Sequence, residues 1–358
     1  RQRQMCIRDS RSADGKPCWG YVYGTTYAEV REISARKKAE HGIYNLNSTD
    51  ITFSEISEQW LYSVRQGVKE STFSHYQYTL RHYLQPVFGD FKVSALSEKI
   101  LEQGLLAVIT PANGKQKPLG ATMAQECLSM LRRICKYAAH FHLIRPLEIT
   151  VKLPQKSPKI LLPFTTEEQK KLQSFVMDAP TPRKIGLLLG FQLGLRIGEI
   201  CGLKWGDFDL LAGTVTIQRT VTRISCGNGH TKVVVQSPKT QNSHREIPLP
   251  KSLLRILKKL SKDFSSGTWF LSGNEEKPVE PRCYRKSIYG YLKKASVHQA
   301  HPHALRHTFA TTCLQAHCDI KTLSELLGHA DAAVTLKKYV HSDMTRKRKE
   351  INRVFENF

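Results

Sequence analysis

The sequence predicts a multidomain protein that is mainly α-helical and carries a small β-sheet. Its 358 residues correspond to two or three domains of ordinary size. Apolar residues recur at helical spacing from about residue 51 to 150, whereas strand patterns gather between residues 214 and 249. Helical patterns flank those strands on both sides, so the second half is predicted to be a mixed α+β domain.

The amino-terminal region predicts a small strand and helix module. Aromatic residues alternate with smaller ones over 17–24, which predicts a strand. Thr26 and Glu29 have the spacing of a capping box and predict a basic helix that ends near Lys38. The first ten residues, RQRQMCIRDS, resemble translated library-linker sequence. We expect 1–10 to be non-native and leave it out of the fold prediction.

A block of four or five helices is predicted over 51–150. Thr52 and Glu55 form a capping box before its first helix, and Ser97 caps a later one. A long helix over about 121–142 carries an apolar stripe at helical spacing. Many basic residues remain for the exposed faces of this block.

The second domain is predicted over 161–345, after a Pro- and Lys-rich linker at 153–164. A capping box of Thr165 and Glu168 opens its first helix, and a second helix covers 182–193. Three strands are then predicted, at 214–224, 232–236 and 245–249. Helices resume at about residue 251.

The charge of the chain indicates a polyanionic partner. Lys and Arg number 54 against 31 Asp and Glu, which gives a net charge of +23 and a pI near 9.7. Such an excess favours DNA or RNA as the partner rather than a membrane surface. No apolar run approaches the ~20 residues of a spanning helix, so we expect a cytoplasmic protein without a membrane partner. The nine cysteines include no CxxC pair, which argues against a disulfide framework or zinc ribbon.

Four segments of the second domain carry the residues with chemical significance. They are GLRIGEICGLKWGDFD (194–209), SPKTQNSHREIPL (237–249), HPHALRHTFATTCL (301–314) and LLGHADAAVTLKKYVH (326–341). In order and spacing they resemble the catalytic domain of the tyrosine recombinases, the phage integrase family. The remnant at 11–45 resembles the arm-binding domain of integrases from phages and conjugative transposons, and we expect it to be truncated. The block at 51–150 resembles the helical, SAM-like core-binding domain.

Arg196 is a candidate phosphate ligand. Cleavage of a phosphodiester without a metal needs a nucleophile, positive charge at the non-bridging oxygens and an acid for the leaving oxygen. The planar guanidinium of Arg196 suits bidentate phosphate contact. Glu199 lies three residues further on and can face Arg196 across one helical turn. By resemblance Glu199 supports Arg196, and an ordinary helix ion pair is compatible with that role.

His303 and Arg306 form an HxxR pattern, whose members share a helix face. By resemblance Arg306 is the second phosphate clamp, and His303 contacts phosphate or accepts a proton. The rival interpretation is a metal site, since His301 and His307 lie close in sequence. The segment lacks the glutamate of HExxH, which argues against zinc.

Tyr339 is the candidate nucleophile and lies ten residues after His329. A phenol has a pKa near ~10 and needs a base or a positive field to become a good nucleophile. The resemblance makes His329 a hydrogen-bond partner of the scissile phosphate. It also implies a hairpin lysine that protonates the departing 5′ oxygen. Lys239 in SPKT is our candidate for that acid, and Lys232 competes with it.

The resemblance implies a mechanism and a set of partners. Tyr339 forms a 3′-phosphotyrosine at a double-stranded attachment site, and two rounds of strand exchange occur within a homotetramer on DNA. Excisionase and DNA-bending proteins are possible accessory partners. No cofactor is implied, and the sequence contains neither GxxxxGK[ST] nor a carboxylate cluster for two-metal chemistry. A terminal tail helix at 346–358 either packs on a neighbouring protomer or closes its own domain.

Three other functions compete with an integrase of a mobile element. A Xer-like resolvase shares the chemistry, but Xer-type enzymes lack an arm-binding domain such as the one that 11–45 resembles. A type IB topoisomerase fits the four segments less well. A non-catalytic DNA-binding protein, such as a decayed integrase, would have the same charge but no need for the six candidate residues.

Overall fold

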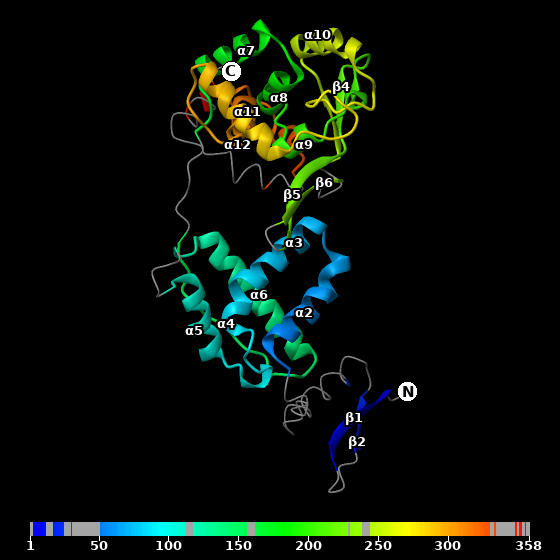
Figure 1. The fold of residues 1–358 in the computed structure, drawn as a ribbon, viewed down its shortest axis with the longest axis vertical. Coiled ribbons are helices and arrows are strands. Elements are labelled where there is room, and N and C mark those ends of the chain that lie inside the picture. The colour runs from blue at the N-terminus through cyan, green and yellow to red at the C-terminus, as the bar shows by residue number, and fades with distance from the viewer. Residues whose placement is uncertain are drawn as a thin grey trace. The chain divides into compact units, whose positions relative to one another are not determined.

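A computed structural model describes most of the chain, which divides into two compact units. The described residues are 3–11, 17–24, 30, 51–111, 117–155, 162–227, 230–237, 244–329, 333, 348, 351, 352 and 355. The first unit comprises Arg1–Pro158 with Ser225–His230, and the second comprises Lys159–Ile224 with Thr231–Phe358. Both contain mainly helices with small antiparallel sheets, as predicted (Figure 1). The finer division into five stretches stays a prediction.

The first unit contains the predicted helical block. Its α-helices are α2 (Phe53–Val64), α3 (Glu70–Thr79), α4 (Gln85–Phe88), α5 (Glu98–Ile109) and α6 (Ala121–His140). A π-helical turn at Leu80–Leu84 joins α3 to α4, and short 3₁₀ turns lie at Arg65–Gly67 and Val93–Ala95. The capping box of Thr52 and Glu55 and the cap of Ser97 are both confirmed. One face of α6 is buried in the apolar core of this block.

An antiparallel strand pair precedes the helical block. The predicted strand over 17–24 is confirmed as β2 (Pro17–Gly24). It pairs with β1 (Arg3–Arg11), so most of the stretch that we left out of the fold prediction forms a strand. Met5 and Ile7 have the spacing of two that puts residues on one face of a strand, a pattern that the comparison with linker sequence led us to disregard. The helix predicted from Thr26 lies outside the described residues, apart from Val30.

The second unit is packed around one apolar helix, α8 (Pro182–Gln192). Its helices are α7 (Thr166–Asp178), α8 (Pro182–Gln192), α9 (Ile197–Cys201), α10 (Lys251–Leu260), α11 (Pro281–Lys294), α12 (His303–Gln315) and α13 (Ile320–Leu327), with 3₁₀ turns at Trp205–Asp207 and Ser261–Asp263. Residues 185–191 of α8 are all buried. Helices α7, α9, α11 and α12 pack against α8, and α13 packs against α12. None of the helices in the described ranges has the length and hydropathy needed to cross a bilayer.

The strands of the second half differ from the prediction in two respects. A short strand that was not predicted, β3 (Phe208–Asp209), precedes the others. The predicted strand 214–224 is two strands, β4 (Thr214–Ile217) and β5 (Thr220–Gly227). Between them, the buried carboxylate of Asp207 accepts hydrogen bonds from the side chains of Gln218 and Arg219. Strand β5 pairs with β6 (His230–Gln236) in a sheet of its own.

Strand β4 belongs to a three-stranded antiparallel sheet that brings Arg245 inside the unit. The sheet has the order β3 (Phe208–Asp209), β4 and β7 (Arg245–Pro248). Ile217 lies opposite Arg245, and Val215 lies opposite Ile247. Arg245 and Ile247 are both buried, whereas Glu246 and Pro248 are exposed. The period of two therefore places a charged side chain on the inward face of β7.

Glu168 should make the stability of the second unit depend on pH. Burial would raise the pKa of its carboxyl, but hydrogen bonds from Thr165 and His298 lower it to about 2. Its stabilising contribution is therefore complete above pH 4.5 and is lost as the pH falls to about 2. We predict that Glu168→Gln lowers the free energy of unfolding by about 1–2 kcal/mol at pH 7. This deficit should shrink below pH 4.5 in calorimetric unfolding.

The exposed neighbour Glu167 provides the matched control, because Glu167→Gln should change the free energy of unfolding by less than about 0.5 kcal/mol. Equal effects of the two substitutions, or a deficit that persists at pH 2, would contradict the assignment.

Candidate active site

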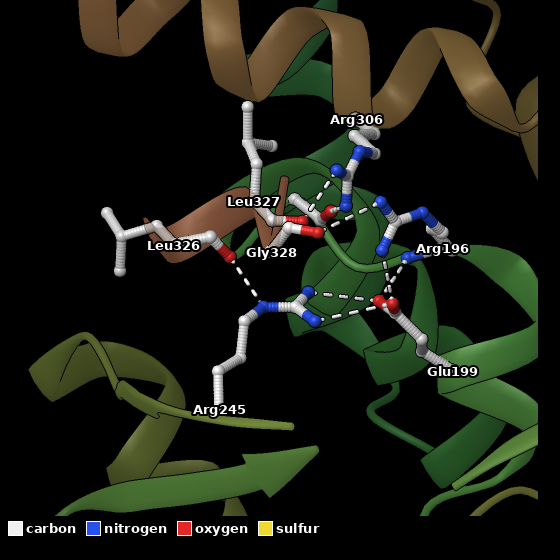
Figure 2. Close-up of polar contacts among 8 residues, drawn as sticks. Arg196, Glu199, Arg245, Arg306, Leu326, Leu327 and Gly328 are labelled. Carbon is white, nitrogen blue, oxygen red and sulfur yellow. Dashed lines mark hydrogen bonds and ion pairs between the residues drawn. The ribbon is translucent and has the colours of Figure 1, made fainter. Parts of the chain in front are cut away.

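A buried carboxylate lies between two arginine side chains at the start of α9 (Figure 2). Glu199 is 4% exposed and accepts a hydrogen bond on Oε1 from Nη1 of Arg196 at 2.6 Å. Its Oε2 accepts from the backbone N–H of Arg196 at 2.9 Å, which caps the helix. Arg245 approaches from β7 with Nη2 3.0 Å from Oε2 and Nη1 3.3 Å from Oε1. The predicted pairing of Arg196 with Glu199 is thus present, with a third member.

The two arginines keep Glu199 ionised. Burial would raise the pKa of its carboxyl, but the charges and hydrogen bonds of Arg245, and then of Arg196, lower it below its usual value. The side chain of Arg245 is 7% exposed, whereas that of Arg196 is 38% exposed. Arg196 is therefore the member of this cluster that a ligand from solvent can reach.

Arg306 lies beside this cluster and is fixed by carbonyl groups. It projects from α12 and is 1% exposed. Nη1 donates to the carbonyl oxygen of Gly194 at 2.8 Å, and Nη2 donates to that of Leu327 at 2.6 Å. Nη2 of Arg196 also donates, at 3.4 Å, to the carbonyl oxygen of Gly328. Both arginines thus contact the end of α13 (Figure 2).

Two glycines with left-handed backbone shape this site. Gly194 has φ +68° in the turn between α8 and Arg196, and a Cβ there would lie 2.5 Å from the ring of Phe309. Gly328 has φ 62° and ends α13 after Leu327. Residues with a Cβ disfavour this conformation, so both turns depend on glycine. The turns point the carbonyl groups of Gly194 and Leu327 at Arg306.

The two candidate histidines flank these turns. His303 is the first residue of α12 and is exposed, and its backbone N–H donates to Nδ1 of His301 at 3.2 Å. His329 follows Gly328 directly and is half-buried, and its backbone N–H donates to the carbonyl oxygen of Ser324. The predicted pattern therefore places His303 one helical turn before Arg306 and His329 next to the carbonyl that Arg196 contacts.

The alternative zinc site would need a group of metal-binding side chains near His301 and His307. Among those residues, no three His, Cys, Asp or Glu side chains are grouped so that they could hold a metal. His301 carries a pKa lowered by partial burial and by the nearby Arg285, and His307 contacts the hydroxyl of Thr311.

The predicted nucleophile and the predicted general acid, Tyr339 and Lys239, both lie outside the described residues. Lys232, the competing lysine, is exposed on β6. The choice between the two lysines therefore stays open.

Sequence reasoning overlooked Arg245 as a member of the site. The signal was present in REIPL, because a period of two puts Arg245 on the same face as Ile247 and Leu249. An arginine on the apolar face of a strand needs a buried anionic partner.

Comparison with known proteins assigns the family. The model of the phage integrase family matches residues 163–346, and that of its N-terminal SAM-like domain matches 52–103. The chain belongs to the phage integrase family. This tyrosine recombinase family carries out site-specific recombination, so the chain is a DNA-cleaving and DNA-rejoining enzyme, as the four motifs predicted.

Individual relatives cover most of the chain. A XerC-like tyrosine recombinase of Caldanaerobacter subterraneus subsp. tengcongensis is 27% identical over 94% of this chain and 92% of its own length. A XerC of Thermodesulfovibrio yellowstonii is 30% identical over 75% and 86%. Among solved structures, the Tn1549 transposon integrase in complex with a circular intermediate DNA matches with a TM-score of 0.67 and 21% identity, over 85% of this chain and 99% of that one.

We predict that Gly194→Ala disrupts the turn before Arg196. The left-handed backbone and the clash with Phe309 should together lower the free energy of unfolding by more than about 2 kcal/mol. Calorimetry of the second unit measures this. Gly290→Ala is the control, because this exposed glycine lies within α11 with nothing near its Cβ position, and alanine should stabilise the helix by about 0.5–1 kcal/mol. A harmless Gly194→Ala would contradict the role of the turn.

Proposed function

We propose that the chain cleaves DNA through a phosphotyrosine and that the Arg196 and Arg306 cluster binds the scissile phosphate. The observation that carries this proposal is the geometry at the end of α13. A reachable guanidinium and a buried one contact successive carbonyl groups there, directly before His329. Fixed arginines in a partly buried site stabilise charge that develops on phosphate oxygens.

Each proposed role follows from the chemistry of the side chain. The hydroxyl oxygen of Tyr339 attacks phosphorus, and the bond from phosphorus to the 5′ oxygen breaks. Lys239 protonates that oxygen, while Arg196 and Arg306 hold the non-bridging oxygens. His303 takes part as a phosphate ligand or as the proton acceptor for Tyr339, and His329 donates a hydrogen bond to the phosphate. The energy of the broken bond remains in the phosphotyrosine, so a 5′ hydroxyl of another strand can reverse the step.

The substrate proposed is a double-stranded attachment site of a mobile element. The net charge of +23 supports a DNA partner. Likeness to a transposon integrase whose structure contains DNA supports the mobile element. The Xer names of two relatives favour a second candidate, a Xer-like resolvase. The integrase and the resolvase would differ in their DNA substrate and share the same chemistry. For both, we propose that the protein acts in the cytoplasm.

We also propose that the chain acts as a homotetramer on DNA, with excisionase and DNA-bending proteins as possible accessory partners. The tail supports contact between protomers. Ile351 is 60% exposed and Phe355 is 67% exposed, and both are helical. Two apolar side chains four residues apart lie on one helix face, which suits packing against another chain.

The phosphotyrosine is tested with Tyr339→Phe. Duplex DNA from the sequences that flank the gene is mixed with each protein in the presence of a chelator, and adducts that resist SDS are sought. We expect the original chain to form an adduct, Tyr339→Phe to form none and the control Tyr289→Phe to form it normally. An adduct with Tyr339→Phe, or none with any protein despite DNA binding, would contradict the proposal.

The tail is tested by replacing Ile351 and Phe355 together with serine. Sedimentation of protein–DNA complexes should show fewer tetramers at equal occupancy of a single site, because the apolar contact between protomers is lost. Asn352→Ser, an exposed polar change in the same helix turn, should leave assembly intact. Unchanged assembly after deletion of 348–358 would refute the contact.

A further inference from the structure

Arg245 has contacts that reach three parts of the second unit. Its Nη atoms form the bidentate pair with Glu199 on α9, and its Nε donates to the carbonyl oxygen of Leu326 on α13 at 2.7 Å. The residue itself begins β7. Figure 2 shows its guanidinium between the Glu199 carboxylate and the end of α13. One planar side chain thus fixes the distance between the helix that carries Glu199 and the one that precedes His329.

The charges of the cluster require such a partner. Without Arg245, the carboxylate of Glu199 would have Arg196 as its remaining charged partner among the contacts described above. The two would then form a closed ion pair with no net charge. With Arg245 present, Glu199 is neutralised from the buried side, and the cluster of Arg196, Glu199 and Arg245 keeps one positive charge. That charge resides at the cluster's most exposed member, Arg196.

The geometry agrees with this division of roles. Glu199 still orients Arg196, since it accepts from both Nη1 and the backbone N–H of that residue. All three guanidinium nitrogens of Arg245 are directed at the Glu199 carboxylate and the Leu326 carbonyl, so its planar fork is engaged within the unit and not by the substrate. It can therefore act on the reaction only through Glu199, Arg196 and the end of α13.

We infer that Arg245 is a positioning residue for DNA cleavage, which neutralises Glu199 so that Arg196 keeps its positive charge for the scissile phosphate. The inference rests on the proposed role of Arg196. It predicts that loss of Arg245 impairs the chemical step more than DNA binding, and that removing the charge of Glu199 restores part of the loss.

The experiment compares full-length variants on one duplex in single-turnover cleavage and in equilibrium binding. We expect Arg245→Ala to slow adduct formation by about 10- to 100-fold, as loss of outer partners of directly acting groups commonly does. Its affinity for the duplex should change less than about threefold, since many other basic residues contribute. Arg245→Lys should fall between Arg245→Ala and the original chain, because lysine keeps the charge but loses the planar fork.

The double variant Glu199→Gln with Arg245→Ala provides the decisive comparison. Its neutral amide no longer neutralises Arg196, so it should form the adduct at least about threefold faster than Arg245→Ala alone. If the single variant does not fold, the double variant, which buries no carboxylate at position 199, should still cleave within about tenfold of the original rate. A folded double variant that is no faster than the single one, or that fails this second limit, would overturn the inference.

Arg219→Ala is the matched control, because Arg219 also pairs with a buried carboxylate of the same unit, that of Asp207. It should lower the unfolding temperature as Arg245→Ala does but leave the cleavage rate within about threefold. Equal slowing by both variants would assign Arg245 a merely structural role and overturn the inference. Absence of any adduct with the original chain would instead overturn the proposed function, and the inference with it.

Discussion

The buried carboxylate of Glu199 is the constraint on which the site depends. An ionised carboxylate that is 4% exposed must be matched by positive charge and hydrogen-bond donors. Arg196 and Arg245 supply these from the start of α9 and from β7. These two elements lie far apart in the sequence. One charged group therefore holds together parts of the fold that are not neighbours in the chain.

Backbone carbonyl groups orient the arginines of the site together with the Glu199 carboxylate. Left-handed turns at Gly194 and Gly328 present carbonyl oxygens to Arg306 and Arg196. These oxygens orient each guanidinium without cancelling its charge, unlike a second carboxylate. Rigid helices hold the turns, because α12 packs against both α8 and α13. The site is thereby organised before any substrate arrives, which is the condition for strong electrostatic catalysis.

Much of this was predictable from sequence because local signals agreed with the fold. Capping boxes at Thr52 and Thr165 marked helix starts. The break between β4 and β5 was not predictable, since it coincides with side-chain contacts to Asp207, a residue of an earlier turn. Arg245 was missed for a related reason. The sequence shows that Arg245 alternates with Ile247. However, Glu199, the anionic partner that stabilises the buried arginine, lies 46 residues away. The period of a strand indicates which face a side chain lies on, but it does not indicate which residue that side chain contacts.

The central claim is that positive charge at Arg196 serves the scissile phosphate. The most direct measurement uses a duplex whose scissile phosphate, once mapped, carries a methyl group in place of one non-bridging oxygen. That substrate has no charge for the arginine to balance. Arg196→Ala should cleave ordinary DNA at least about 100-fold more slowly than the original chain. The account predicts that the same variant cleaves the methylated substrate within about tenfold of the original chain, and an equal defect on both substrates would contradict it.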